Sequence, residues 1–124
     1  MIKIAILDDD KTALMISTAT VEAFLKEKNA EFKLFSFSNP LNFLASAKEE
    51  KFDLSFLDID MPEMNGLDAT RIIKEVDSRT PVIALSAYAF EENIRDAKNA
   101  GCDEFMAKPF KVENLIEMVG KYLD

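Results

Sequence analysis

The chain has 124 residues, of which 48% are hydrophobic and 31% are charged, and its formal net charge is -8. This length fits one compact domain over residues 1–124, and the acidic balance excludes direct binding to nucleic acid or to an anionic membrane as an expected role. No apolar run is long enough to span a membrane and no secretion signal is evident, so we expect a cytoplasmic protein.

Apolar runs of strand length alternate with segments of helical period along the chain. The runs at 2–7, 53–58 and 81–85 are almost continuously apolar, which is typical of interior strands in a parallel sheet. The runs at 32–37 and 103–107 carry more polar residues, so we expect them at the edges of the sheet. Strands that alternate with helices along the chain predict an α/β fold, in which helices cover both faces of a parallel sheet.

Helical segments fill the intervals between these runs. The first is expected over about 11–28 with Asp10 as its N-cap, and Asn39-Pro40 indicates an N-cap followed by proline at the first helical position. Apolar residues recur at helical spacing in the last three segments: Ala69, Ile72, Ile73 and Val76; Phe90, Ile94 and Ala97; Val112, Leu115, Ile116 and Val119. Five βα units favour a single doubly wound, flavodoxin-like parallel sheet of five strands in the order 2-1-3-4-5.

Charged residues follow three of the predicted strands at their carboxyl ends. Asp8 and Asp9 follow the first strand, Asp58 and Asp60 close the third, and Lys108 follows the fifth. Because parallel strands end at one edge of the sheet, these residues should share one pocket, where ligands bind in such folds. Carboxylates about 5 Å apart repel each other by roughly 3 kcal/mol per pair at an effective dielectric of about 20, so a cation is expected among them.

The residue types at this edge suit metal-assisted phosphoryl chemistry. Two adjacent carboxylates, Asp8 and Asp9, are natural oxygen ligands for Mg²⁺, with Mn²⁺ as an alternative. The Asp58 carboxylate could attack phosphorus to give an aspartyl phosphate, while Lys108 and the hydroxyl of Ser86 could contact phosphoryl oxygens. Ordinary interpretations stay open, because a strand-end lysine is usually solvated and a serine there usually shapes a turn.

Asp60 and Cys102 also have ordinary interpretations. Asp60 is either a loop acid with no task or a residue beside the phosphoryl group that affects its lifetime. Cys102, the sole cysteine, is expected to be a small buried side chain. The sequence has no histidine, so it cannot supply a phosphohistidine of its own.

Together these residues resemble the receiver domain of two-component response regulators. The resemblance rests on Ile4-Ala5-Ile6-Leu7-Asp8-Asp9, on residues 56–66, on Ala84-Leu85-Ser86-Ala87, on Ala100-Gly101 and on Lys108-Pro109-Phe110. It implies Asp58 as the phosphoacceptor and Mg²⁺ held by Asp9, Asp58 and the backbone carbonyl of Asp60, with Asp8 acting through water. It also implies Ser86 and Lys108 as the hydroxyl and lysine of the switch, and a cis peptide between Lys108 and Pro109.

Three further positions follow from the same resemblance. Phe105 stands at the aromatic switch position, where the family commonly has tyrosine or histidine, so the polar tip of the ring is missing. Asp60 and Tyr88 stand at positions that tune the lifetime of the phosphoryl group.

The implied function is a signalling switch. A sensor histidine kinase or a histidine phosphotransfer protein would donate the phosphoryl group in trans, and the loop after the fourth strand would shift as Ser86 turns toward it. The surface of the fourth helix, fifth strand and fifth helix would carry the response to an effector that the sequence does not identify, in a monomer or a phosphorylation-dependent dimer. Such a protein is not a conventional enzyme, although it catalyses its own phosphorylation and dephosphorylation.

Three alternatives are weaker. Asp58-Ile59-Asp60 resembles the Asp-x-Asp signature of haloacid-dehalogenase-type phosphatases, but Pro62 stands where that signature usually has threonine. A flavodoxin would need a phosphate-binding loop where this chain has aspartates. A degenerate receiver that acts as an unphosphorylated interaction module is disfavoured, because every expected site position is filled.

Overall fold

The computed structural model describes residues 1–61, 66–108 and 110–123, and strands and helices alternate through them. The strands are β1 (Ile2–Leu7), β2 (Phe32–Phe37), β3 (Leu54–Asp58), β4 (Val82–Ser86) and β5 (Glu104–Ala107). The helices are α1 (Lys11–Glu27), α2 (Pro40–Glu49), α3 (Gly66–Val76), α4 (Glu91–Ala100) and α5 (Val112–Leu123).

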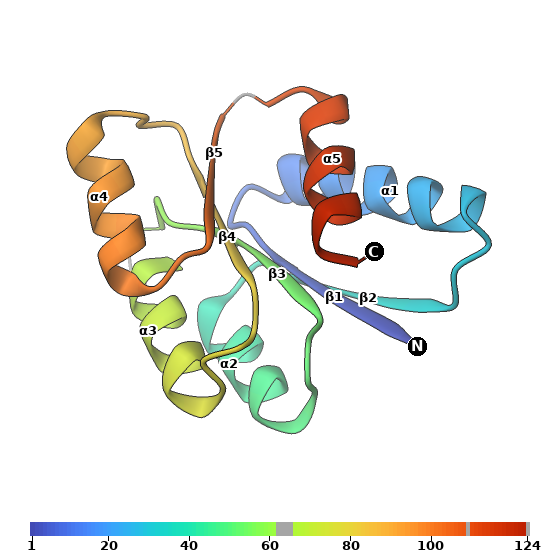
Figure 1. Ribbon diagram of the computed structural model, residues 1–124, viewed down its shortest axis with the longest axis horizontal. Coiled ribbons are helices and arrows are strands. Elements are labelled where there is room, and N and C mark those ends of the chain that lie inside the picture. The colour runs from blue at the N-terminus through green and yellow to red at the C-terminus, as the bar shows by residue number, and fades with distance from the viewer. Residues whose placement is uncertain (62–65, 109, 124) are drawn as a thin grey trace.

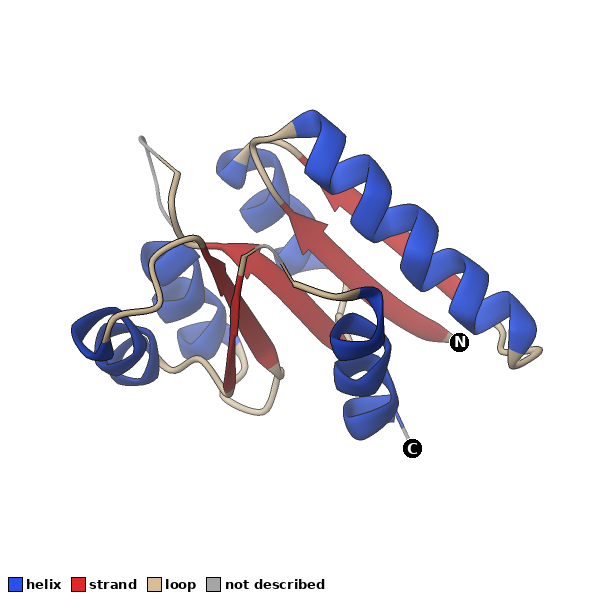
Figure 2. Cartoon of the chain, turned by 90° about the horizontal axis from the view of Figure 1, so that it is seen from above, coloured by secondary structure: helices blue, strands red, loops and turns tan. Residues whose placement is uncertain are grey.

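All five strands lie parallel in one sheet, in the order β2-β1-β3-β4-β5, which confirms the predicted doubly wound fold. The edge strands are β2 and β5, as their polar residues predicted, while every residue of β3 and β4 is buried. These strands end within one residue of each neighbour's end, since Leu7 pairs with Leu57, Asp58 with Leu85 and Ser86 with Ala107. The loops that follow β1, β3, β4 and β5 therefore start from one edge (Figure 2).

Helices cover both faces of the sheet, with α1 and α5 on one face and α2, α3 and α4 on the other (Figure 1). Alternate residues of each strand point to opposite faces, so Ile4 and Ile6 pack in the α1/α5 layer while Ala5 and Leu7 pack in the layer of the other three helices. Two hydrophobic cores thus fix the sheet from both sides.

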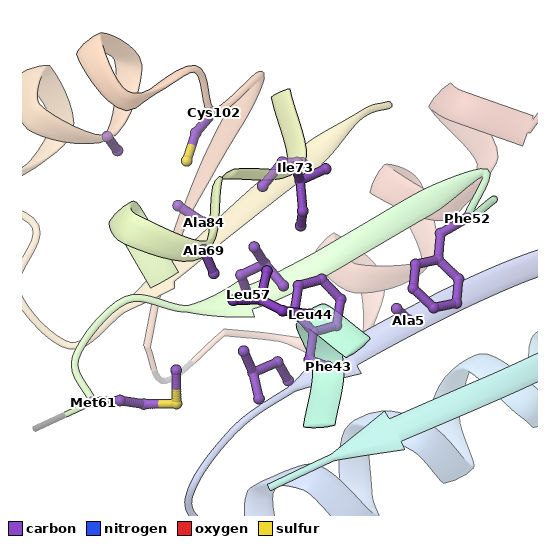
Figure 3. Packing of buried hydrophobic residues seen from close by; sticks show 13 residues of the cluster. Ala5, Phe43, Leu44, Phe52, Leu57, Met61, Ala69, Ile73, Ala84 and Cys102 are labelled. Carbon is purple, nitrogen blue, oxygen red and sulfur yellow. The ribbon is translucent and has the colours of Figure 1, made fainter. Parts of the chain in front are cut away.

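Two buried phenylalanines, Phe43 and Phe52, lie in the core beneath α2, α3 and α4 (Figure 3), and partly buried rings pack against it. Phe43 of α2 stacks on Phe52 with ring centroids 6.0 Å apart and planes 13° apart, and Phe37 meets Phe43 edge-on at 5.5 Å. Burial of one such ring stabilises the fold by roughly 2–3 kcal/mol. Phe37 ends β2 and Phe52 lies just before β3, so this packing anchors both strands.

Both predicted helix caps are present. Asp10 accepts hydrogen bonds from the backbone N–H groups of Thr12 and Ala13 at 3.0 and 3.3 Å. Asn39 accepts one from Leu41 at 2.8 Å, and Pro40 occupies the start of α2. Asp10 therefore has a structural role and is separate from the chemistry of its neighbours.

The predicted apolar faces of three helices extend too far. Phe90 lies before α4 rather than in it and is 65% exposed, and Val76 and Val112 are 62% and 50% exposed. Each of these residues stands at a helix end, where the neighbouring layer no longer covers it, whereas Ala97, Ile73 and Leu115 in the helix interiors are buried. Cys102 is buried as predicted.

Candidate functional site

Three charged residues that are far apart in the sequence meet at the carboxyl edge of the sheet. Asp8 follows β1, Asp58 ends β3, and each is 2% exposed. The ammonium of Lys108, which follows β5, lies 3.0 Å from Oδ2 of Asp8 and 3.4 Å from Oδ2 of Asp58. The structure therefore brings together the acids and the lysine that the sequence placed at separate strand ends.

Backbone hydrogen bonds hold both carboxylates in place. Oδ1 of Asp8 accepts from the N–H of Asp10 and Oδ1 of Asp58 accepts from the N–H of Asp60, each at 2.9 Å. Each acid thus uses one oxygen to shape the turn after its strand and presents the other oxygen to Lys108. The strand ends themselves are tied by main-chain bonds, such as that from the N–H of Lys108 to the carbonyl of Ser86 at 2.7 Å.

Burial dominates the electrostatics of Asp58. It raises the pKa of Asp58 to about 7, against the opposing influence of the Asp60 N–H and of the Lys108 ammonium. For Lys108, burial acts to lower the pKa, but the hydrogen bond to Asp8 and the negative charge of Asp58 outweigh it, so that its pKa is raised. Lys108 therefore stays protonated, and a further cation would favour the ionised form of Asp58.

The arrangement of acids fits a hard divalent cation. Asp8, Asp9 and Asp58 each offer a carboxylate oxygen, and these oxygens lie within 4.8 Å of one another. Asp8 and Asp58 are buried while Asp9 is exposed, so the cluster is reached from solvent on the Asp9 side. Oxygen ligands with room for water are the coordination that Mg²⁺ and Mn²⁺ accept in proteins.

Ser86 ends β4 and is 1% exposed. Its hydroxyl donates to Oδ1 of Asp60 at 2.8 Å, and the N–H of Ala87 donates to Oδ2 of the same carboxylate, also at 2.8 Å. The sequence predicted Asp60 and Ser86 as separate candidates and gave no sign of Ala87. Almost every residue has a backbone N–H, so the residue type does not indicate which one is used as a donor. The Ala87 donor is identified by the structure, which places the loop after β3 beside the loop after β4.

The two aromatic candidates lie at different depths. Phe105 of β5 is half-buried and packs against the core beneath α2, α3 and α4, whereas Tyr88 is 57% exposed and contacts Ser86 through its backbone N–H. The predicted cis peptide at Lys108-Pro109 involves Pro109, which is outside the described residues, and stays a prediction.

Comparison with known proteins decides the family. The family model for the response regulator receiver domain matches residues 4–120. The chain belongs to this family. A receiver domain has a phosphoacceptor signalling role in two-component systems and works with histidine kinases or phosphotransfer proteins, which is the role that the sequence predicted.

Relatives of similar length support the assignment. The polar-differentiation response regulator DivK of Brucella anthropi is 29% identical over 97% of this receiver domain and 94% of DivK. Sporulation initiation phosphotransferase F of Bacillus subtilis is 31% identical over 98% of this chain and 93% of its own. The solved BeF3-activated receiver domain of DrrB is 33% identical, with a TM-score of 0.82 and coverage of 99% of this chain and 97% of that one.

Other relatives are much longer. Hybrid signal transduction histidine kinase G of Dictyostelium discoideum is 37% identical over 68% of this chain, but the matched region is 2% of that protein. Receiver domains therefore occur in proteins of very different size. Across the described residues, the helices lack the length and apolar character needed to cross a membrane.

Proposed function

We propose that Asp58 is the phosphoacceptor of this receiver domain. The observation that carries the proposal is the placement of Asp58, a buried carboxylate at the end of β3 with an ammonium 3.4 Å away and two further acids beside it. A carboxylate so placed combines a nucleophilic oxygen, a cation for the incoming phosphoryl group and a set of metal ligands.

The proposed reaction transfers a phosphoryl group from a phosphohistidine of a partner protein. A carboxylate oxygen of Asp58 attacks phosphorus, a new O–P bond forms, and the N–P bond to the imidazole breaks as that nitrogen retains the electron pair. The 124 residues contain no histidine, so the donor lies outside them, on a histidine kinase or a histidine phosphotransfer protein. Hydrolysis of the acyl phosphate, with water as nucleophile, would return Asp58 to its original state.

The acidic cluster would hold Mg²⁺, or Mn²⁺ in its place. Asp8, Asp9, Asp58 and the backbone carbonyl of Asp60 are the proposed ligands, with Asp8 contacting the ion through water. When bound, the ion offsets the negative charge that otherwise opposes the approach of a phosphoryl group to three carboxylates. The excess of acid over base among the described residues of this edge supports a cation requirement.

Lys108 and Ser86 would bind the phosphoryl oxygens, and the segment after β4 would move with Ser86. The proposed output surface consists of α4, β5 and α5, and the exposed Tyr88 and Phe90 in the segment that leads into α4 support a change at that surface. Phe105 would couple to it by packing alone, since its ring has no hydroxyl. We further propose that residues 1–124 form one domain that acts in the cytoplasm, as a monomer or a phosphorylation-dependent dimer.

Phosphorylation with acetyl phosphate and Mg²⁺ tests the proposal directly. We expect the wild type to gain one acid-stable, hydroxylamine-sensitive phosphoryl group in intact-mass measurements, and Asp58→Asn to gain none. Beryllofluoride should bind the wild type in the presence of Mg²⁺, because the DrrB receiver domain has been captured in a BeF3-activated form.

A matched control is Glu31→Gln, which makes the same carboxylate-to-amide change at an exposed position before β2. This control should be phosphorylated like the wild type. Equal labelling of wild type and Asp58→Asn would contradict the assignment, and failure of the wild type to respond would favour an unphosphorylated interaction module. Sustained release of phosphate from small phosphate esters would favour the phosphatase alternative.

A further inference from the structure

The carboxylate of Asp60 bridges two neighbouring loops at the site. Asp60 lies two residues after the end of β3 and is exposed, yet both of its oxygens are engaged by the segment that follows β4. Oδ1 accepts from the hydroxyl of Ser86 and Oδ2 accepts from the N–H of Ala87, both at 2.8 Å. Hydrogen bonds to an ionised acceptor are stronger than those between neutral groups, so this bridge favours one arrangement of the two loops.

The hydroxyl of Ser86 has no hydrogen left for a second acceptor. Its single hydrogen points to Asp60 at 2.8 Å, with the carbonyl of Tyr88 farther away at 3.3 Å. The N–H of Tyr88 donates to the same hydroxyl oxygen at 3.0 Å, which fixes its orientation. A serine hydroxyl carries one hydrogen and a backbone amide carries one, so Ser86 and Ala87 cannot serve Asp60 and a phosphoryl group together.

Asp60 is also connected to the proposed phosphoacceptor. Its backbone N–H donates to Oδ1 of Asp58 at 2.9 Å, so the residue that would be modified helps to position the loop that holds the switch residues. Conversion of Asp58 to an acyl phosphate would reduce the negative charge on the carboxyl oxygens and place new, highly charged acceptors beside Ser86. The bridge uses the side-chain oxygens of Asp60, whereas the proposed metal role belongs to its backbone carbonyl.

We infer that Asp60 is a positioning residue that holds Ser86 and Ala87 in the unphosphorylated arrangement and competes with the phosphoryl group for their two hydrogens. This inference rests on the proposed function of Asp58 and extends it to the unphosphorylated state. Asp60 restrains activation before phosphorylation, in addition to any effect on the lifetime of the phosphoryl group afterwards. Removal of the Asp60 carboxylate should release both donors.

The bridge itself is tested without metal or phosphoryl mimic, by amide NMR of the whole chain. In Asp60→Ala, the Ala87 amide should shift upfield and exchange with solvent about tenfold faster, since one hydrogen bond of this strength corresponds to about a tenfold change in an opening equilibrium. Asp60→Asn should show a smaller change, because its single carbonyl oxygen can replace only one of the two carboxylate oxygens that form the bridge.

The matched control is Asp10→Asn. It removes one negative charge from the same edge, and asparagine preserves the N-cap of α1. Ala87 should be unaffected in this control. An unchanged Ala87 amide in Asp60→Ala would overturn the inference.

The competition is tested by beryllofluoride affinity at saturating Mg²⁺. Asp60→Ala should bind about tenfold more tightly than the wild type, and Asp60→Glu should also bind more tightly, because the longer side chain keeps the charge but not the two-oxygen geometry. Equal affinity of wild type and Asp60→Ala would overturn the inference. So would a gain in Asp10→Asn that matches the gain in Asp60→Ala, since it would assign the effect to net charge. If no variant and no wild type binds beryllofluoride, the proposed function of Asp58 fails, while the amide measurement still decides whether the bridge exists.

Discussion

The two ends of the sheet differ in how their charged side chains are paired. At the amino end, lysines and acids are matched one to one in Lys3–Glu50, Lys74–Asp103 and Lys121–Glu104. At the carboxyl end, the described residues bring Asp8, Asp9 and Asp58 together, and Lys108 contacts Asp8 and Asp58. The ion pairs at the amino end stabilise the fold, whereas the carboxyl end holds more negative than positive charge in a buried place.

The Lys74–Asp103 pair at the amino end also forms hydrogen bonds with the backbone. Oδ2 of Asp103 accepts from both the ammonium of Lys74 and the N–H of Val82, each at 2.8 Å, while Lys74 also donates to the carbonyl of Thr80. At the carboxyl end, in contrast, burial raises the pKa of Asp58 to about 7. The difference indicates that the ion pairs at the amino end stabilise the fold, whereas the buried Asp58 at the carboxyl end costs stability, a cost that we relate to its proposed role as phosphoacceptor.

The largest expected effect is at the matched end. Asp103→Ala should lower the free energy of unfolding by about 2–3 kcal/mol, because it leaves the largely buried ammonium of Lys74 and the N–H of Val82 without this acceptor. Urea denaturation followed by circular dichroism measures the loss. Lys121→Ala breaks an exposed pair at the same end and should cost much less, because solvent screens that pair. Similar losses in both variants would contradict the distinction drawn between the two pairs.

The next effect has the opposite sign and depends on pH. A carboxyl group whose pKa is raised in the folded state binds more protons there than in the unfolded state, so stability falls as pH rises between about 4 and 7. In EDTA, Asp58→Asn should therefore match the wild type near pH 4 and exceed its stability by about 2 kcal/mol at pH 8. This is about half of what the full pKa change would give, because solvent reaches the site on the Asp9 side. A stability difference that stays constant over this pH range would contradict the expectation.

Mg²⁺ should offset the excess negative charge at the carboxyl end and so stabilise the protein. Mg²⁺ at ten times its dissociation constant should stabilise the wild type by about 1.4 kcal/mol, through preferential binding to the folded state. Thermal unfolding with and without Mg²⁺ measures this gain, which Asp9→Asn should largely remove. Asp53→Asn, which changes an acid at the amino end, should retain the gain, and its loss there would show that the effect is not local.

The smallest expected gain in stability lies between the two ends. The hydroxyl of Ser55, the second residue of β3, is fully buried, and no hydrogen-bond partner is found for it among the described residues. Ser55→Ala should raise the free energy of unfolding by about 0.5–1 kcal/mol, because a buried hydroxyl without a partner is destabilising. Its Mg²⁺ response should equal that of the wild type. A destabilised Ser55→Ala would mean that the hydroxyl has a partner in solution.

Much of the fold could be predicted because the physical signals are local. Continuous apolar runs identified β1, β3 and β4 as interior strands, and the polar residues of β2 and β5 placed them at the edges. The helix faces were less accurate at their ends, where Phe90, Val76 and Val112 are exposed. Periodicity reports which residues share a helix face, but it does not report where the covering layer stops.

The sequence by itself determined the order of the elements and the presence of acids and a lysine at strand ends, because strand polarity brings those ends to one edge. Only the tertiary structure decided that Lys108 contacts both Asp8 and Asp58, and that the Asp60 carboxylate accepts hydrogen bonds from Ser86 and Ala87. These contacts depend on strand register and loop direction, and one of the donors is a backbone amide. Non-local geometry of that kind has no counterpart in residue type or spacing.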